Sequence, residues 1–336
     1  MGEFTRWGIL GLGRIGNDFA QCLRDMPDAK ITAAGSRDIE KSKAFCAKYG
    51  GTAHGSYEDL VNDPNVDIIY VATPHNFHEE HVILCARAGK SILCEKPFAV
   101  SEKQAAHMFE EAEKAGVFIM EGLWSRFFPA WEYTREQVQS GKFGKIISIH
   151  NVTSWGVEQV MKDNRLFRPD LAGGALLDAG IYCLSVATNL LGPDEYPEKI
   201  NAYGYIGETG IDEYDSVAIK YASGPHFTMM CGLRGMLQES HIITEHGTFT
   251  LPRHRNPSTV TLSYRDRGED WRKQSILQHE FHYDGQGFQY EARHVQDCLR
   301  KGLKLSPRVP PKETLTLMRI CDTIRKQINL VYPFEV

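Results

Sequence analysis

The chain has 336 residues, of which 42% are hydrophobic and 24% charged, and its 38 basic residues stand against 43 acidic ones for a net charge of −5. This length predicts two domains, and the composition excludes collagen-like and disordered classes of protein. The slight acidic excess, without a long run of lysine or arginine, argues against nucleic acid as a partner.

Eight cysteines are spread along the chain without a CxxC pair, and a chain of this length needs no disulfides to stabilise a small core. We therefore expect reduced thiols and a cytoplasmic location. The first seven residues have no apolar signal core. The apolar stretch at residues 66–73 is too short to cross a bilayer, and the stretch at residues 175–191 is interrupted by Asp178, so we expect no membrane span.

Short apolar runs alternate with amphipathic stretches over the first 120 residues. The apolar runs predict strands at residues 6–10, 30–36, 66–73 and 91–94. The amphipathic stretches predict helices at residues 14–24, 38–48 and 78–88, and a short helix after Ser56, with Asp38 and Ser56 as N-caps. Apolar strands in strict alternation with helices are typical of a parallel sheet covered on both faces. The sequence therefore predicts an α/β domain with a doubly wound parallel sheet.

The pattern changes after Glu121. The alternation of apolar and polar residues predicts strands at residues 145–155, 199–206, 216–221, 226–232, 239–244, 248–251 and 258–264, whereas residues 207–215 are typical of a loop. Helices are predicted at about residues 130–139, 175–190, 287–300 and 312–329. These elements predict a second, α+β domain, in which helices lie against one face of a largely antiparallel open sheet.

A glycine-rich motif, Gly11-Leu12-Gly13-Arg14-Ile15-Gly16, lies between the first predicted strand and the first predicted helix. Gly11 permits a tight turn, Gly13 lets the backbone approach a pyrophosphate, and Gly16 lets the helix pack closely on the strand. This context makes residues 1–122 a dinucleotide-binding Rossmann domain. Residues 123–336 are then expected to form the domain for substrate binding and dimerisation.

The end of the second predicted strand indicates which dinucleotide binds. An NAD enzyme places an acidic residue here, on the ribose hydroxyl, whereas this chain has Ser36-Arg37. A guanidinium can pair with the 2′-phosphate of NADP and a serine can donate to it, so NADP is favoured over NAD. Two other interpretations stay open: Arg37 can be a solvated surface charge, or Asp38 can turn inward to hold the ribose.

Two further groups of residues are candidates for a role in catalysis. Glu95-Lys96-Pro97 follows a predicted strand, and the carboxyl ends of strands in a doubly wound sheet face the ligand. Asp178 and Tyr182 are four residues apart in an apolar predicted helix, so they share one face of it. An aspartate in such a helix costs free energy unless it is paired, and a backbone amide or an arginine can satisfy it without any catalytic role.

Four segments together resemble the glucose-fructose oxidoreductase and inositol dehydrogenase superfamily in order and spacing. They are the glycine motif, residues 72–78 (ATPHNFH), Glu95-Lys96-Pro97 and residues 173–182 (GGALLDAGIY). Residues 120–129 (MEGLWSRFFP) and the tyrosine at 182 are similar to one branch of it, the dimeric dihydrodiol dehydrogenases and the NADP-dependent D-xylose dehydrogenases. The resemblance covers nearly the whole chain and weakens at residues 156–171 and 253–286.

The resemblance implies roles for residues of this sequence. Tyr182 would be the general acid/base, Lys96 its electrostatic partner, and Asp178 a group that positions the substrate or the active site. A nearby ammonium group stabilises a phenolate, which agrees with the first two roles. The implied cofactor ligands are Gly11, Gly13, Arg14, Ile15, Gly16, Ser36, Arg37, Thr73, Pro74, His75, Asn76, His78, Glu95 and Lys96. Relatives also lead us to expect a cis Lys96-Pro97 bond.

The implied activity is an NADP-dependent hydride transfer between nicotinamide and a CH–OH group of a sugar, a cyclic polyol or a trans-dihydrodiol. A sugar or imine reductase of the same superfamily is an alternative, and so is a regulator that binds a dinucleotide without catalysis. Aromatic rings that could pack on such a small-molecule substrate are Trp124, Phe127, Phe128 and Trp155, although plain core packing is as good an interpretation for each one.

Two histidine patterns are weak evidence for a metal. His75, His78 and His81 are three residues apart, but Pro74 at the start of the helix argues against three successive helical ligands. His279-Glu280 begins like a zinc-binding HExxH motif, but Tyr283 occupies the place of the second histidine. We expect no metal.

The second domain predicts a homodimer. Its antiparallel sheet needs cover on two faces, and the predicted helices suffice for one. The strand at residues 200–206 has bulky residues on both sides. Pairing of two such sheets about a two-fold axis would bury them.

Overall fold

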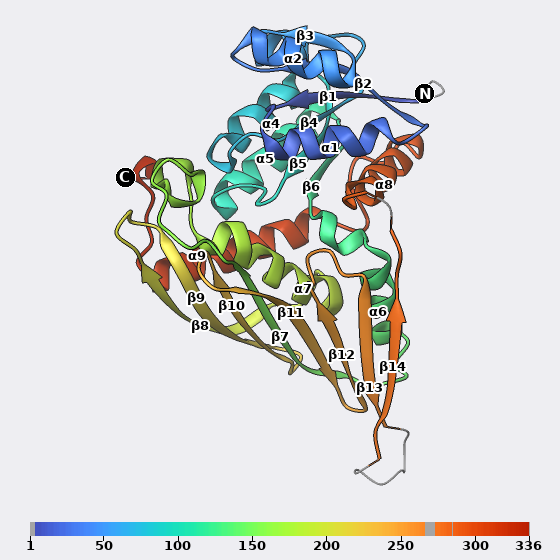
Figure 1. Ribbon diagram of the computed structural model, residues 1–336, viewed down its shortest axis with the longest axis vertical. Helices are drawn as coiled ribbons and strands as arrows, with labels where there is room; N and C mark the ends of the chain where they lie inside the picture. Colours follow the sequence, from blue (N-terminus) through green and yellow to red (C-terminus); the bar gives the residue numbers. More distant parts are fainter. Residues whose placement is uncertain (1–3, 266–272, 284, 336) are drawn as a thin grey trace. The chain divides into compact units, whose positions relative to one another are not determined.

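The computed structural model describes residues 4–265, 273–283 and 285–335 (Figure 1). These residues form two compact units, each built on its own sheet. The first unit comprises residues 4–124 and 285–315, and the second comprises residues 125–283 and 316–335.

The described part of the first unit contains a six-stranded sheet in the order β3-β2-β1-β4-β5-β6, with parallel pairing throughout. Its strands are β1 (Thr5–Leu10), β2 (Ala29–Gly35), β3 (Thr52–His54), β4 (Ile68–Val71), β5 (Ser91–Glu95) and β6 (Ile119–Gly122). Its helices are α1 (Arg14–Arg24), α2 (Ile39–Tyr49), α3 (Tyr57–Val61), α4 (His78–Arg87), α5 (Glu102–Ala115) and α8 (Phe288–Arg300). The strand order reverses between β1 and β4, which is where doubly wound sheets bind their ligands. The predicted fold class is confirmed for this unit.

Local capping signals position the helices of this sheet. The Asp38 carboxylate accepts hydrogen bonds from the backbone N–H groups of Glu40 (3.0 Å) and Lys41 (3.4 Å) at the start of α2. Ser56 accepts from the N–H of Asp59 (3.0 Å) and caps α3. Both predicted N-caps are therefore confirmed. Strands β3 and β6 and helix α5 were not predicted from the sequence. Strand β3 gives little signal because it has only three residues, none of them buried.

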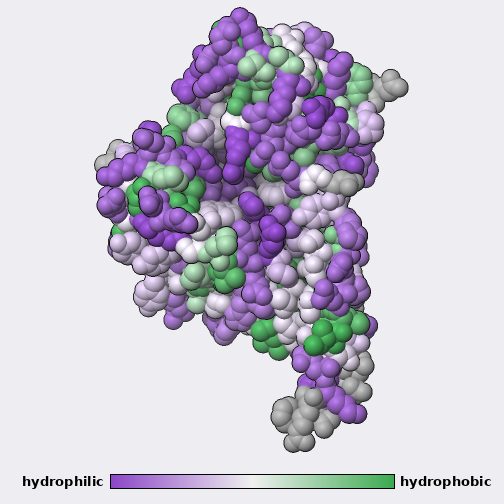
Figure 2. Space-filling model, in the orientation of Figure 1, coloured by the Kyte–Doolittle hydropathy of each residue, from purple (hydrophilic) through white to green (hydrophobic). Residues whose placement is uncertain are grey.

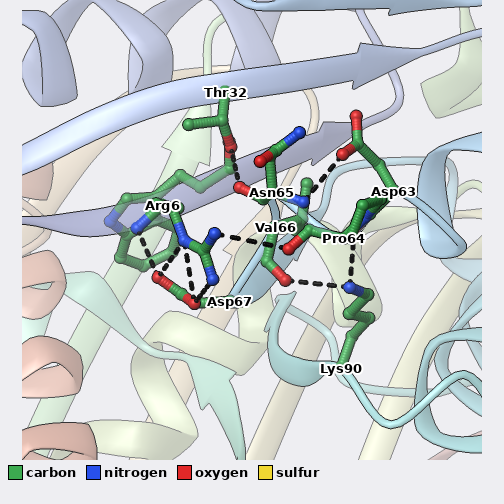
Figure 3. Close-up of polar contacts among 9 residues, drawn as sticks. Arg6, Thr32, Asp63, Pro64, Asn65, Val66, Asp67 and Lys90 are labelled. Atoms are coloured by element: carbon green, nitrogen blue, oxygen red, sulfur yellow. Dashed lines mark hydrogen bonds and ion pairs between the residues drawn. The ribbon is translucent and has the colours of Figure 1, made fainter. Parts of the chain in front are cut away.

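The amino ends of β1, β4 and β5 are tied together by the network drawn in Figure 3. The Arg6 guanidinium pairs with the Asp67 carboxylate (2.5 Å), which also accepts from the Arg6 backbone N–H (2.9 Å). The Lys90 ammonium donates to the carbonyl oxygens of Asp63 (2.7 Å) and Val66 (2.9 Å). These contacts hold the strands together at their amino ends, opposite to the end of the sheet where the ligand is expected.

The described part of the second unit contains an eight-stranded sheet in the order β14-β13-β12-β11-β7-β10-β9-β8. Its pairings are antiparallel apart from the parallel pair β7 and β10. The strands are β7 (Ile146–Trp155), β8 (Pro197–Ile206), β9 (Asp212–Tyr221), β10 (His226–Gly232), β11 (Met236–Thr244), β12 (Gly247–Pro252), β13 (Thr259–Tyr264) and β14 (Ser275–Glu280). This confirms the predicted α+β architecture with a largely antiparallel sheet.

One face of this sheet is covered by α6 (Pro129–Gln139) and by α7 (Ile181–Leu191), which contacts β7 and β10. A π-helical turn, η5 (Leu176–Gly180), leads directly into α7. Within the described ranges, Pro169–Leu191 is the one helical stretch long and apolar enough to cross a membrane, but 94% of its most apolar window is buried. It is a core helix of this unit.

The boundary between the units differs from the predicted division at residue 122, because α8 belongs to the first unit. Phe288 of α8 packs edge-on against Phe19 of α1, with ring centroids 6.1 Å apart. Gln296 donates to the carbonyl oxygen of Asp28 (2.6 Å), and Arg300 pairs with the carboxylate of the same residue (3.1 Å). The chain thus returns to the first unit after the second sheet, which its linear order does not reveal. Helix α9 (Pro311–Gln327) begins in the first unit and ends in the second.

The predicted loop at residues 207–215 is partly wrong, since β9 already begins at Asp212. Asp212, Glu213 and Asp215 are all buried there, so polar side chains occupy positions where a strand normally shows apolar ones. The edge strand β14 was not predicted, because nearly all of its residues are exposed and its pattern does not alternate.

The surface drawn in Figure 2 is largely polar, and its hydrophobic residues gather in small separate patches. On the second sheet, large apolar side chains are nevertheless exposed. They include Tyr203 on β8, Met230 on β10, and Met236 and Leu237 on β11.

Candidate active site

The glycine motif forms the turn from β1 into α1. Gly11 has a positive φ of 97°, and a Cβ on it would lie 2.8 Å from the backbone after β4 at Ala72 and Thr73. A Cβ on Gly16 would collide with the carbonyl oxygen of Gly11. Gly13 is the N-cap of α1, without a side-chain cap and without an acidic residue in the first turn. The turn therefore has the close packing and the exposed helix N-terminus that a pyrophosphate requires, so these residues fit a dinucleotide.

The carboxyl end of β2 carries a positive charge. Arg37 is exposed and forms a hydrogen bond with the Tyr57 side chain, which opposes the rise that burial causes in the tyrosine pKa. Ser36 Oγ accepts from the backbone N–H of Asp38 (3.2 Å). The Asp38 carboxylate caps α2, so the structure favours a capping role for Asp38 over an inward turn to a ribose.

The segment that follows β4, residues 72–77, is hydrogen-bonded to histidines of the helix that comes after it. Thr73 Oγ1 lies 2.9 Å from His81 Nδ1, and the His81 ring packs edge-on against Tyr57. Burial, together with nearby His78 and the charge of Arg37, lowers the pKa of His81 to about 4, so this ring is neutral. His75 and Asn76 lie in the short helical turn η1 (His75–Phe77), and His75 is buried.

His78 is buried within the first unit rather than open to a ligand. Its Nε2 lies 2.9 Å from the carbonyl oxygen of Thr73, and its Nδ1 lies 3.0 Å from that of Pro97. Burial lowers its pKa to about 4. Both ring nitrogens face backbone oxygens, so His78 joins the segment after β4 to the segment after β5.

The segment after β5 presents Lys96. The Lys96-Pro97 bond is cis, as predicted. Glu95 is buried. Its Oε1 accepts a hydrogen bond from the Tyr70 hydroxyl, and its Oε2 accepts one from the backbone N–H of Lys96 (3.1 Å). Lys96 itself is half-buried, and its charge contributes to the lowered pKa of His78. Glu95 therefore holds the turn that carries Lys96.

The second unit brings three predicted residues together. Asp178 lies in η5, where its Oδ2 accepts from the indole N–H of Trp155 (2.9 Å) and its Oδ1 pairs with the Arg165 guanidinium (2.7 Å). Tyr182 follows one turn later in α7 and is 4% exposed. Its ring meets that of Trp155 edge-on, with centroids 6.0 Å apart. Arg255 lies over the same Trp155 ring at 5.1 Å.

Arg165 and Arg255 were not identified from the sequence. Both lie in segments where the resemblance weakens, so no motif marks them. Arg165 could have been sought as the partner of Asp178, because a buried aspartate needs a partner and an arginine was one of the two kinds expected for it.

The predicted aromatic substrate contacts divide into two groups. Trp155 lies beside Asp178 and Tyr182, as described above. Trp124 belongs to the first unit and stacks on Phe288 at 4.5 Å, and Phe127 is only 8% exposed. Phe128 is fully buried and packs edge-on against Tyr283 at 4.8 Å, which favours the alternative of plain core packing for this ring.

Among the residues that the structure describes, no three His, Cys, Asp or Glu side chains gather in a way that could hold a metal ion. The ring of His279, from the second histidine pattern, lies 2.9 Å from the Tyr133 hydroxyl through its Nε2.

Comparison with known proteins agrees with this geometry. Residues 5–123 match the model of an oxidoreductase family with an NAD-binding Rossmann fold, and residues 131–250 match the GFO/IDH/MocA C-terminal domain. The chain is 36% identical to trans-1,2-dihydrobenzene-1,2-diol dehydrogenase from Bos taurus over 345 residues, which covers 98% of each chain. The chain belongs to the GFO/IDH/MocA oxidoreductase family.

One further relative carries the same name, and two solved structures share the fold. The enzyme of that name from Homo sapiens is 35% identical, with 98% of each chain covered. Among solved structures, an aldose-aldose oxidoreductase from Caulobacter crescentus superposes with a TM-score of 0.86 at 22% identity, covering 97% of this chain and 98% of that one. A 3-ketoreductase from Actinomadura kijaniata in complex with NADP gives a TM-score of 0.81 at 21% identity, with the same coverage. This GFO/IDH/MocA protein is thus an oxidoreductase with an NAD(P)-binding Rossmann fold.

Proposed function

We propose that this oxidoreductase uses NADP to transfer a hydride between nicotinamide and a CH–OH group of a trans-dihydrodiol, a sugar or a cyclic polyol. The observation that carries the proposal is the 35–36% identity, over 98% of the chain, to trans-dihydrodiol dehydrogenases. D-xylose is the sugar that we expect first, because of the branch that the sequence resembles. Relatives named as dehydrogenases also favour an enzyme over a regulator without catalysis.

The first unit would hold the cofactor. The turn at residues 11–16 would bind the pyrophosphate, and Arg37 with Ser36 would bind the 2′-phosphate. When bound, the nicotinamide supplies or accepts the hydride. The exposed guanidinium at the end of β2 and the use of Asp38 as a helix cap support NADP over NAD.

Tyr182 and Lys96 would handle the proton. During oxidation Tyr182 takes the hydroxyl proton of the substrate, and the Lys96 ammonium stabilises the phenolate that results. Both oxygens of Asp178 already accept bonds from Trp155 and Arg165, so Asp178 orients this region rather than taking the proton. Trp155 presents its ring beside Tyr182, where a cyclic substrate can pack.

The test is a panel of substrates with NADP and with NAD, followed through the absorbance of the reduced nicotinamide. Reduction of NADP with a trans-dihydrodiol or D-xylose is expected, and Tyr182→Phe should abolish most of it. Reduction of keto sugars or imines without oxidation of any diol or aldose would favour the reductase alternative. Tight NADP binding without turnover across the panel would contradict an enzymatic function.

We also propose a homodimer that pairs the uncovered faces of the second sheet. Tyr203 is 79% exposed on β8, Met230 is 41% exposed on β10 and Leu237 is 50% exposed on β11. Exposed apolar side chains gathered on one sheet are typical of an interface.

A further inference from the structure

Two buried carboxyl groups in the second unit have no part in the chemistry above. Asp212 and Asp215 lie at the start of β9, and both are fully buried. A buried carboxyl group lowers the stability of the fold unless it is hydrogen-bonded or keeps its proton, so these two must be stabilised by their surroundings.

Asp212 holds the start of the helix that carries the candidate catalytic residues. Its Oδ2 accepts from the backbone N–H of Leu176 (2.6 Å), the first residue of η5. Gly174 has a φ of 131°, and a Cβ on it would collide with Asp212 Oδ1. The carboxyl group thus occupies the space that this glycine leaves open. Asp178 lies two residues after Leu176, and Tyr182 lies six residues after it.

Asp215 reaches the other end of the same turn. Its carboxyl group interacts directly with that of Asp212, and its Oδ2 accepts from the Cys231 thiol (3.5 Å). Within the described residues, the Oδ1 atoms of both acids are buried without a hydrogen-bond partner. A Cβ on Gly180, the last residue of η5, would lie 3.0 Å from Cys231 Sγ. The two acids therefore contact η5 at its first residue directly and at its last residue through Cys231.

A bond between two carboxyl groups requires a proton, because an ionised carboxylate has no donor. Burial and the charge of Asp215 raise the pKa of Asp212 well above its usual range, and burial raises that of Asp215 to about 6. The titratable groups that face the pair are Cys231 and Tyr332, and burial raises the pKa of both, so both are neutral. Arg325, behind the ring of Tyr332, pairs with Glu335 and Asp322.

We propose that Asp212 and Asp215 share one proton, and that this pair is a positioning device that fixes η5 and so aims Asp178 and Tyr182. The role in catalysis rests on the proposed function, in which Tyr182 exchanges the substrate proton. Loss of the shared proton would leave two carboxylates in contact in an enclosed site, and their repulsion would shift the start of the helix.

The pair also gives a signature that needs no substrate. Its native pKa values lie above the value of about 3.9 for an unfolded aspartate, so the native state binds more protons than the unfolded state above that pH. Its contribution to stability is therefore complete below about pH 4 and declines as the pH rises through about 6 and beyond.

Asp212→Asn and Asp212→Ala test the proposal together. The amide that Asp212→Asn introduces can accept from Leu176 and donate to Asp215, so it imitates the protonated acid, whereas alanine removes both bonds. With the best substrate of the panel, Asp212→Ala should lower kcat about tenfold to a hundredfold, the scale of a misplaced catalytic group, while the Kd of NADP stays unchanged. Asp212→Asn should keep kcat within about twofold and flatten its decline at high pH.

Urea denaturation between about pH 4 and pH 8 is the second arm. Asp212→Asn should gain stability relative to the natural chain as the pH rises, and a constant difference would overturn the shared proton. Glu213→Gln, on the next residue of β9, is the matched control, since that side chain pairs with Arg234 instead. Full kcat in Asp212→Ala at every pH would overturn the positioning role. If Asp212→Ala does not fold, Asp215→Asn replaces it, with the high-pH decline in kcat expected to vanish and its persistence counting against the proposal.

The two arms also separate this proposal from the proposed function. If no substrate of the panel is turned over, the proposed function fails, and the denaturation arm still decides whether the pair holds a proton.

Discussion

Arg37 is the residue that the site offers for distinguishing the two nicotinamide cofactors. Its guanidinium is exposed at the end of β2, where an NAD enzyme has an acidic group. Arg37→Ala should raise the KM of NADP about tenfold or more, because a charge-assisted bond to phosphate is lost, and should leave that of NAD nearly unchanged. Lys43→Ala, which removes an exposed cation on the following helix α2, should alter neither value. Equal losses for both cofactors would show that Arg37 does not contact the 2′-phosphate.

Tyr182 is expected to act on the proton and not on the cofactor. Because a positioned acid/base contributes about 10² to 10⁴ in rate, Tyr182→Phe should lower kcat by that factor and leave the Kd of NADP unchanged. Steady-state kinetics and fluorescence titration measure the two quantities. Tyr196→Phe, at a partly exposed tyrosine elsewhere in the second unit, is the control. Near-normal turnover in Tyr182→Phe would assign the proton to another residue.

Lys96 and Tyr182 should behave as one functional group. Lys96→Met is expected to lower kcat about as much as Tyr182→Phe, because the phenolate loses its stabilising charge. Groups that act together are not additive, so the double variant should be little slower than either single one. A double variant whose loss equals the product of the single losses would show that the two side chains act independently.

At the level of elements, the network at the amino ends of β1, β4 and β5 is expected to stabilise the first unit. Burial acts to raise the pKa of Asp67, but the bonds from Arg6 outweigh it and hold that pKa below its usual range. The stabilisation is therefore present above the unfolded value of about 3.9 and is lost as the pH falls further. Asp67→Asn should cost on the order of 1 kcal/mol at neutral pH, since the pair is partly exposed to solvent.

Urea denaturation at several pH values measures this effect. The difference between Asp67→Asn and the natural chain should shrink as the pH falls below about 4. Asp25→Asn is the control, because its carboxylate is 67% exposed, its ion pair with Arg24 is long at 3.7 Å, and its hydrogen bond from Gln21 (3.2 Å) can also be accepted by an asparagine. A destabilisation that does not change with pH would contradict an ionic origin.

Elements with a local signal could be predicted from the sequence, and those without one could not. Helix α1 has the predicted bounds because glycines precede it and its apolar residues have a helical period. The start of β9 was missed because Asp212 and Asp215 are buried, where contacts with Leu176 and Cys231 from distant parts of the chain make acids tolerable. Arg165 and the return of α8 to the first unit depend on contacts between distant parts of the chain, which spacing along the sequence does not encode.

For the whole molecule, the uncovered sheet of the second unit predicts a dimer. Light scattering at assay concentration should give twice the chain mass of 38.0 kDa. Met230→Glu should shift the mass towards that of a monomer, since a two-fold axis would bury two added charges in one interface. Glu198→Gln, at an exposed acid on β8, is the control. A monomer mass for the natural chain would contradict the dimer.

The path of the chain has a consequence for how this protein can be divided. The backbone passes between the two units three times: after Trp124, before α8 and within α9. A fragment that ends near residue 123 would lack α8 and would expose the apolar surface of Phe19 that Phe288 covers. The dinucleotide-binding part is therefore not a detachable module, and a gene fusion or truncation that treats it as one removes a piece of its own hydrophobic core.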